Sequence, residues 1–200
     1  MVTRPLPAAS RRRTVAYAVV KRLLKMDEEQ FLSPVFQARS EVFLRQRIAG
    51  QFIQIKVGSK VIDVGVSNRT GHFETSFDLD GPTVLENSVQ TPVGLKLYFE
   101  SVDIERQFRP ARTTGYVQLV DPNGSSVISD IDDTVKLTNV ADRRELLANT
   151  LLREFVPFPD MVDLYEQWSL SGAVFHYVSA SPWQLTRPLN DFFHLAGLPD

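Results

Sequence analysis

Cysteine is absent from the 200 residues of this sequence. Disulfide bonds and thiolate metal sites are therefore excluded, and cysteine usage gives no evidence on the redox compartment. The chain also has no apolar stretch close to the roughly 20 residues that a membrane-spanning helix requires. The short apolar run at residues 15–20 is followed at once by Lys21-Arg22, so we expect no secretory signal. We expect a cytoplasmic protein that could lie peripherally on membranes.

Acidic side chains are missing from the first 26 residues, although the chain as a whole has a net charge of −2. That segment holds seven basic residues, whereas the rest of the chain has 15 basic and 24 acidic ones. From Thr14 to about Gln30 the spacing predicts a helix with an apolar stripe formed by Val15, Ala18, Val19, Leu23 and Met26.

This basic amphipathic helix has three interpretations. It could lie on an anionic membrane surface, or it could be a mitochondrial presequence, which is Arg-rich and free of acids. We favour a third interpretation, in which the apolar stripe packs on the protein and the basic residues face solvent. We assign residues 1–34 to this basic tail and helix.

Residues 35–120 have a different pattern, in which apolar residues alternate with polar ones. Short alternating segments separated by turns such as Gly58-Ser59 and 68–71 favour an antiparallel β-sandwich. The predicted strands are 42–44, 52–57, 61–66, 72–77, 93–99 and 115–119. His72 lies beside one turn, and we interpret this lone imidazole as structural.

Residues 121–200 alternate strands with helices after a turn at 121–124, which predicts a parallel sheet. The expected strands are 126–129 and 173–178, and the expected helices are 142–153, 159–170 and 182–196. Gly197 should end the last helix. The predicted fold class is therefore mixed, with an N-terminal antiparallel β-sandwich followed by a parallel α/β domain.

The most informative motif follows the first of these strands and reads Asp130-Ile131-Asp132-Asp133-Thr134. Ligands of parallel sheets bind beyond the carboxyl ends of the strands, where Asp130 stands. Its carboxylate could attack phosphorus to form an aspartyl-phosphate, and Asp132 could act as general acid and base. Two carboxylates beside a phosphate require a hard cation such as Mg²⁺. Thr134 would orient Asp130 or bind the loop backbone.

The alternative for this motif is an acidic turn that caps a helix, and a second motif weighs against it. Residues 175–183 read Phe-His-Tyr-Val-Ser-Ala-Ser-Pro-Trp, in which a strand leads to Ser179 and a helix opens at Pro182. The Ser179 hydroxyl would bind a phosphate oxygen near the helix start. We expect Ser181 to cap the helix, His176 to be buried and hydrogen-bonded, and Trp183 either to line the pocket or to pack.

The two motifs together resemble a known family. Asp130–Thr134 is similar to motif I of the haloacid dehalogenase superfamily and Ser179 to its motif II. The longer strings 127–140 and 177–185, with Phe158-Pro159, resemble the phosphatidate phosphatase family named for a yeast actin-patch protein. The resemblance covers residues 127–198, and 68–73 more weakly resemble a turn of transthyretin-like domains.

The resemblance implies that the C-terminal part has a haloacid-dehalogenase-like fold and removes phosphate from phosphatidate with Mg²⁺. By carry-over, Asp130 is the nucleophile and a metal ligand, and Asp132 is the acid/base and gives its backbone carbonyl to the metal. Ser179 binds phosphate, and Thr134 is a further substrate-binding candidate. The substrate would be a phospholipid at a membrane surface.

The superfamily also has a motif III lysine and motif IV acids, which we expect beyond residue 200. Lys136 is too close to motif I to be that lysine. We therefore predict that the 200-residue chain is truncated and turns over slowly or not at all. Two alternatives stay open: a phosphatase of the same fold that acts on a soluble phosphate ester or phosphoprotein, and a non-catalytic adaptor.

Overall fold

The structure is a computed structural model that describes residues 1–7, 9–91, 94–102 and 113–199. These residues form two compact units, one made of 1–4 and 46–123 and the other of 5–45 and 124–200. A two-stranded sheet pairs β1 (Thr3–Pro5) with β2 (Arg45–Arg47). Helices and both kinds of sheet are present, which confirms the predicted mixed class, whereas the domain boundaries at 34 and 120 stay predictions.

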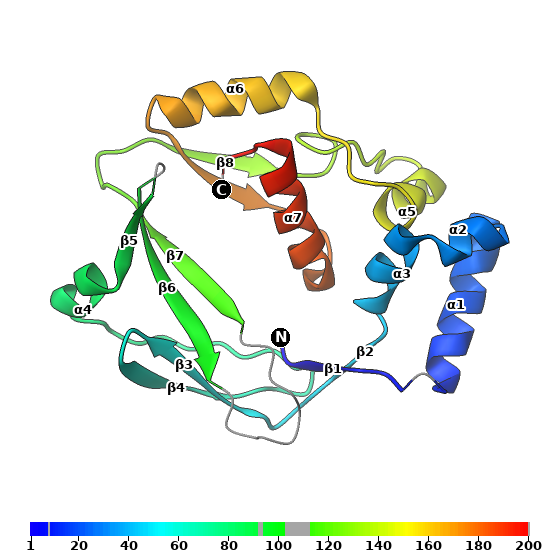
Figure 1. Cartoon of the computed structure of the whole chain (residues 1–200), viewed down its shortest axis with the longest axis horizontal. Coiled ribbons are helices and arrows are strands. Elements are labelled where there is room, and N and C mark those ends of the chain that lie inside the picture. The colour runs from blue at the N-terminus through cyan, green and yellow to red at the C-terminus, as the bar shows by residue number, and fades with distance from the viewer. Residues whose placement is uncertain (8, 92–93, 103–112, 200) are drawn as a thin grey trace. The chain divides into compact units, whose positions relative to one another are not determined.

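The first unit contains an antiparallel sheet of five strands, shown in Figure 1. β6 pairs with β3, β5 and β7, and β3 also pairs with β4. The strands are β3 (Phe52–Val57), β4 (Lys60–Val66), β5 (Ser88–Thr91), β6 (Gly94–Val102) and β7 (Thr114–Leu119), with α4 (Gly81–Glu86) before β5. The antiparallel sheet is confirmed, but the second layer of a sandwich is not found among the described residues.

The predicted turn at Gly58-Ser59 is confirmed, since Val57 pairs with Lys60 across it in an antiparallel hairpin. Gly58 has a φ of 56°, and a Cβ there would lie 1.8 Å from Oδ1 of Asn87. This turn therefore requires glycine both for its backbone conformation and for space.

Two predicted strands of this region are wrong. Residues 42–44 form the turn after α3 (Pro34–Glu41), and residues 72–77 have no regular structure. The strand predicted from Val93 is β6, with Val93 itself outside the described residues.

The second unit is built on β8 (Ser126–Asp130) and β9 (Val174–Val178), which pair in parallel as predicted. The strands alternate, so that Ser129 and Phe175 are buried while Ile128 and His176 are exposed. The buried side packs with α6 (Pro159–Leu170) and α7 (Thr186–Ala196), which follows the one-turn 3₁₀ helix η1 (Trp183–Leu185). The parallel sheet is confirmed, and a haloacid-dehalogenase-like fold stays a prediction.

Local capping explains where the helices of this part begin and end. Asp142 accepts hydrogen bonds from the amides of Arg144 and Glu145 at the start of α5 (Arg143–Leu151), as an N-cap carboxylate does. Pro159 occupies the first position of α6, and Gly197 ends α7 with a φ of 73°, as predicted.

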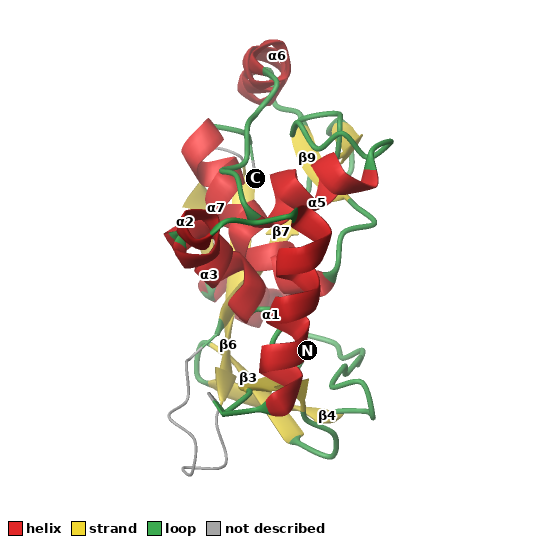
Figure 2. Cartoon of the chain, turned by 90° about the vertical axis from the view of Figure 1, so that its right-hand side faces the viewer, coloured by secondary structure: helices red, strands yellow, loops and turns green. Residues whose placement is uncertain are grey.

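The N-terminal helices belong to the same unit. They are α1 (Arg11–Leu24), α2 (Glu28–Leu32) and α3, in place of the single helix predicted from 14 to 30. Leu24 and Phe36 share a buried cluster with Ala148 and Leu151 of α5, and Figures 1 and 2 both show α1–α3 beside α5. Arg39 of α3 adds a hydrogen bond of 2.9 Å to the carbonyl of Thr150.

The inward face of α1 differs from the predicted one. Tyr17, Val20 and Leu24 contribute to the buried cluster, whereas Val15 and Leu23 of the predicted stripe are exposed. Of that stripe, only Met26, just beyond the helix, is buried.

Within the described residues, no helix combines the length and apolar character needed to span a bilayer.

Candidate active site

The register of the two parallel strands brings the two predicted motifs together. Asp130 at the end of β8 lies opposite Val178 at the end of β9, and Ser179 follows directly. The loop after Asp130 then turns back, and Ser179 Oγ donates a hydrogen bond of 3.1 Å to Oδ2 of Asp132. The expected meeting of the motif at 130–134 with Ser179 is therefore present in the structure.

Asp132 is the most heavily bonded carboxylate of the site. Oδ1 lies 2.8 Å from Nζ of Lys136 and accepts a hydrogen bond of 2.7 Å from the Thr138 hydroxyl. Oδ2 accepts hydrogen bonds from Ser179 and, at 3.0 Å, from the hydroxyl of Ser181. Four donors from two segments thus fix its position.

These donors also set the protonation state of Asp132. Burial alone would raise the pKa of this carboxyl, since its side chain is only 17% exposed. The hydrogen bonds from Lys136, Thr138 and Ser181, with the positive charge of Lys136, outweigh burial and hold the pKa below its ordinary value. In this arrangement Asp132 is a carboxylate at neutral pH.

Lys136 belongs to the candidate site, although the sequence did not assign it a role there. Lys136 is 2% exposed. Its ammonium group contacts Asp132, the Thr138 hydroxyl and the ring of Phe155, whose centre lies 4.8 Å away. An ammonium buried this deeply requires a counter-ion, and Asp132 provides it. The sequence signal that could have indicated this ion pair is the spacing of four residues between Asp132 and Lys136.

Asp133 has a separate, structural role. Its Oδ1 accepts hydrogen bonds from the amides of Thr138 and Asn139, at 2.8 and 2.6 Å, and Oδ2 accepts one from Val140 at 2.7 Å. Burial is the largest single influence and raises the pKa of this carboxyl, but the three amide donors, with the charge of Lys136, together outweigh it and lower the pKa. With a φ of 57°, Asp133 turns the chain and closes the loop at 133–140.

Asp130 is exposed at the end of β8, and its carboxylate has no hydrogen-bond or ion-pair partner among the described residues. Its backbone is held instead. Its carbonyl accepts a hydrogen bond of 2.7 Å from the Ser129 hydroxyl, and Ser129 Oγ in turn accepts one of 2.9 Å from the buried Tyr165. This chain of bonds to α6 leaves an accessible carboxylate on a fixed backbone, which suits a nucleophile.

The remaining residues singled out in the sequence differ in whether the structure gives them the expected environment. Thr134 is half-buried, and its hydroxyl makes no hydrogen bond with the described residues, so its role stays a prediction. Ser181 does not cap the helix but binds Asp132, because η1 begins after Pro182 without a side-chain cap. His176 was expected to be buried; it is exposed, with Nε2 3.4 Å from the Ser126 hydroxyl. Trp183 is 73% exposed.

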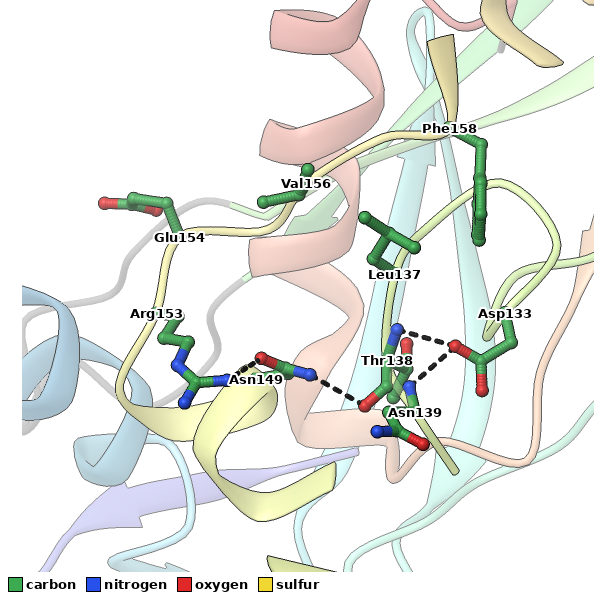
Figure 3. Close-up of a pocket in the computed structure, with 9 residues that line it drawn as sticks. All are labelled: Asp133, Leu137, Thr138, Asn139, Asn149, Arg153, Glu154, Val156 and Phe158. Atoms are coloured by element: carbon green, nitrogen blue, oxygen red, sulfur yellow. Dashed lines mark hydrogen bonds between the residues drawn. The ribbon is translucent and has the colours of Figure 1, made fainter. Parts of the chain in front are cut away.

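A cavity of about 500 Å³ lies beside the loop, and Figure 3 shows the side chains that line it. It is lined by Asp133, Leu137, Thr138, Asn139, Asn149, Arg153, Glu154, Val156 and Phe158. Asn149 donates to the carbonyl of Thr138 and accepts from Arg153, so these polar groups bind one another across the cavity wall. We therefore place the chemistry at Asp130 and Asp132, which do not line this cavity.

The oxygen atoms at the strand end fit Mg²⁺ in part. This cation is commonly bound by one or two carboxylates, with water and substrate phosphate completing its shell. Asp130 offers an uncommitted carboxylate, and no described hydrogen bond uses the backbone carbonyl of Asp132. Within the described part of the chain, no three His, Cys, Asp or Glu side chains cluster as a metal site.

Comparison with known proteins confirms the family resemblance. Residues 125–200 match the model of the family described as the catalytic domain of phosphatidate phosphatase APP1. This match covers the acidic loop, Ser179 and the helices around them.

An uncharacterised protein of Schizosaccharomyces pombe is 28% identical over 173 residues, which is 82% of this chain. The chain spans 28% of the length of that curated relative. No solved structure matches the chain.

Proposed function

We propose that the protein is a Mg²⁺-dependent phosphatidate phosphatase that releases phosphate and leaves diacylglycerol. The observation that carries this proposal is the placement of Asp130, Asp132 and Ser179 at the adjoining carboxyl ends of β8 and β9. All three residues lie in the region matched to the phosphatidate phosphatase family.

In the first step an oxygen of the Asp130 carboxylate attacks phosphorus. An aspartyl-phosphate bond forms, and the bond between phosphorus and the glycerol oxygen breaks. The departing oxygen takes a proton from Asp132, which acts as general acid. In the second step Asp132 removes a proton from water, whose oxygen attacks phosphorus. The bond between phosphorus and the Asp130 oxygen breaks, which releases inorganic phosphate and restores the Asp130 carboxylate.

The hydrogen bonds of Asp132 suggest how one residue could serve both steps. As the carboxylate that four donors stabilise, Asp132 is ready to act as base in the second step. If a substrate phosphate accepted the hydrogen bond of the Ser179 hydroxyl, Oδ2 of Asp132 would lose one of its two donors. The negative charge of the phosphate would also raise the pKa of Asp132, as nearby like charges do, and so favour the protonated form that the first step needs.

Asp130 and the backbone carbonyl of Asp132 would hold Mg²⁺, which when bound offsets the repulsion between the carboxylates and the phosphate. Because the described residues offer one uncommitted carboxylate at this site, Asp130, we expect weak metal affinity and slow turnover from the 200-residue chain.

The test compares Asp130→Asn with the unchanged chain on phosphatidate and Mg²⁺. Phosphate release should fall by several orders of magnitude. Acid quenching followed by mass spectrometry should detect one phosphoryl group on the unchanged chain and none on the variant, which remains informative if turnover is slow. Asp163→Asn, at an exposed position of α6, is the matched control and should behave like the unchanged chain.

The same experiment separates the alternatives. Equal phosphate release from Asp130→Asn and the unchanged chain would exclude Asp130 as nucleophile. Phosphoryl transfer from a small soluble ester but not from phosphatidate would favour the soluble-substrate phosphatase. A chain that neither takes up a phosphoryl group nor releases phosphate from any substrate would favour the adaptor.

A further inference from the structure

The outer face of α1 presents apolar side chains to solvent. Val15, Val19 and Leu23 are 61%, 51% and 60% exposed. A spacing of four residues places them one above another along one side of the helix. They therefore form a continuous apolar strip about two turns long, which we call the α1 strip.

Basic side chains flank the α1 strip. Arg11, Arg12, Arg22 and Lys25 are exposed and have no ion-pair partner among the described residues. The inward basic residues behave differently, since Arg13 lies 2.9 Å from Glu41 and Lys21 pairs with Glu28. The outer basic residues are thus the ones whose charge is not offset by a nearby acid.

The opposite side of α1 is fixed to the protein. Tyr17 and Val20 pack against the cluster that contains Leu24, Phe36 and Ala148. Tyr17 also lies edge-to-face with Phe31, at 5.5 Å between ring centres. The α1 strip cannot turn inward without breaking this packing, so its exposure is a built feature of the unit.

The first turn of α1 does not favour helix stability. It contains three arginines and no acid, and the side chain of its N-cap, Ser10, accepts no capping hydrogen bond. Cations near the positive end of a helix are unfavourable. An anionic partner outside the helix would remove this repulsion.

We propose that the α1 strip and its four basic residues bind the surface of an anionic lipid bilayer. Apolar side chains at the centre of the face would enter the boundary between headgroups and acyl chains, while the basic side chains bind lipid phosphates. The central apolar strip favours a bilayer over a nucleic acid, whose backbone is recognised mainly by basic and polar groups. The site is separate from the acidic loop and does not depend on the proposed reaction.

The number of basic residues removed sets the expected loss of membrane affinity. Each basic residue close to an anionic membrane surface contributes a factor of about five to binding, and salt screens this contribution. Replacing Arg11 and Arg22 together with Gln should therefore weaken binding by about 25-fold. Val15→Ser with Val19→Ser should also weaken binding, but the loss should persist at high salt.

The experiment measures co-sedimentation of the full chain with vesicles of phosphatidylcholine mixed with phosphatidylserine. Phosphatidylserine supplies negative charge and is not the proposed substrate, so capture at the acidic loop cannot account for binding. Lys56→Gln with Arg69→Gln is the matched control, because it removes the same charge from exposed positions of the other unit. Circular dichroism melting checks that each variant is folded.

The proposal predicts binding to anionic vesicles and not to pure phosphatidylcholine, with loss in both α1 variants and none in the control. Equal binding by the Arg11/Arg22 variant and the unchanged chain would overturn it. So would a failure of the unchanged chain to bind anionic vesicles at low salt, or selective binding of a nucleic acid or an acidic peptide instead.

Discussion

Replacing Lys136 with Met tests whether the buried ion pair organises the candidate site. Met has a similar length and is apolar, but it has no charge and no donor, so it also loses the contact of the ammonium group with the Phe155 ring. The change leaves Asp132 with three hydroxyl donors, from Thr138, Ser179 and Ser181. The variant thus isolates the charge of Lys136 from the packing of its side chain.

The structure sets the magnitude of the expected loss. Removing one partner of a buried ion pair typically costs 3–5 kcal/mol, because the other charge stays buried. The lower end, about 3 kcal/mol, applies because the three hydroxyls still solvate the Asp132 carboxylate. A loss of this size is a large part of the ordinary 5–15 kcal/mol stability of a domain.

The loss should depend on pH in a definite direction. A carboxyl whose pKa is lowered by folding stabilises the protein above its unfolded pKa, near 4, and this stabilisation is lost as pH falls through the folded value. Asp132 belongs to this class. Without Lys136, burial becomes dominant and the pKa of Asp132 should rise, so the difference between variant and unchanged chain should shrink at acid pH.

Urea unfolding of the unchanged chain, Lys136→Met, Asp132→Asn and the double variant measures the coupling directly. Asp132→Asn alone leaves the Lys136 ammonium buried without its counter-ion, so the double variant should be more stable than the two single losses predict. We expect a coupling energy of about 2 kcal/mol, within the range for contacting residues. Additive losses, within about 0.5 kcal/mol, would refute the reasoning.

Variants at three further positions test the second unit by urea unfolding at pH 7. Asp133→Ala leaves three amides of the loop without their acceptor and should cost about 2–3 kcal/mol, while Asp133→Asn should cost less. Equal losses would show that these hydrogen bonds do not hold the loop. Phe36→Ala removes a fully buried ring and should cost about 3–5 kcal/mol, whereas a negligible loss would show that α1–α3 do not stabilise the unit. Tyr165→Phe removes the hydroxyl that binds Ser129 and should cost about 1 kcal/mol, and an unchanged midpoint would contradict the proposed anchoring of β8.

The part of the chain after residue 124 was predictable because its signals are local. Pro159 begins α6 at the expected residue, and Gly197 ends α7 in the left-handed conformation. Capping and positive φ depend on a few neighbouring residues, which a sequence displays directly. The parallel pairing of β8 and β9 followed from the alternation of strands and helices.

The two wrongly predicted strands lie in segments whose residue pattern alone does not determine their structure. The segment at 72–77 alternates like a strand, but a strand also needs a partner for its backbone groups, and the structure describes no pairing there. The segment at 42–44 is too short for its apolar residues to define a period. Ser33-Pro34, which caps and begins α3, was the sequence signal for the helix that precedes residues 42–44.

The face of α1 shows a limit of periodicity. Two apolar sets occur on this helix at helical spacing, one containing Val15 and Val19 and the other Tyr17, Val20 and Leu24. Hydrophobicity alone favours neither. The aromatic contacts of Tyr17 with Phe31 and Phe36 decide which set faces inward, and these contacts depend on how α2 and α3 fold back.

The two adjacent aspartates show why residue type alone could not assign the site. Asp132 and Asp133 are chemically identical neighbours, yet one binds four side chains and the other three backbone amides. The left-handed turn at Asp133 separates their directions. Thr138 joins the two roles, since its amide binds Asp133 and its hydroxyl binds Asp132. The amide hydrogen bonds to Asp133 therefore support the chemistry at Asp132 indirectly, by holding in place a hydroxyl that helps to keep the Asp132 carboxyl ionised.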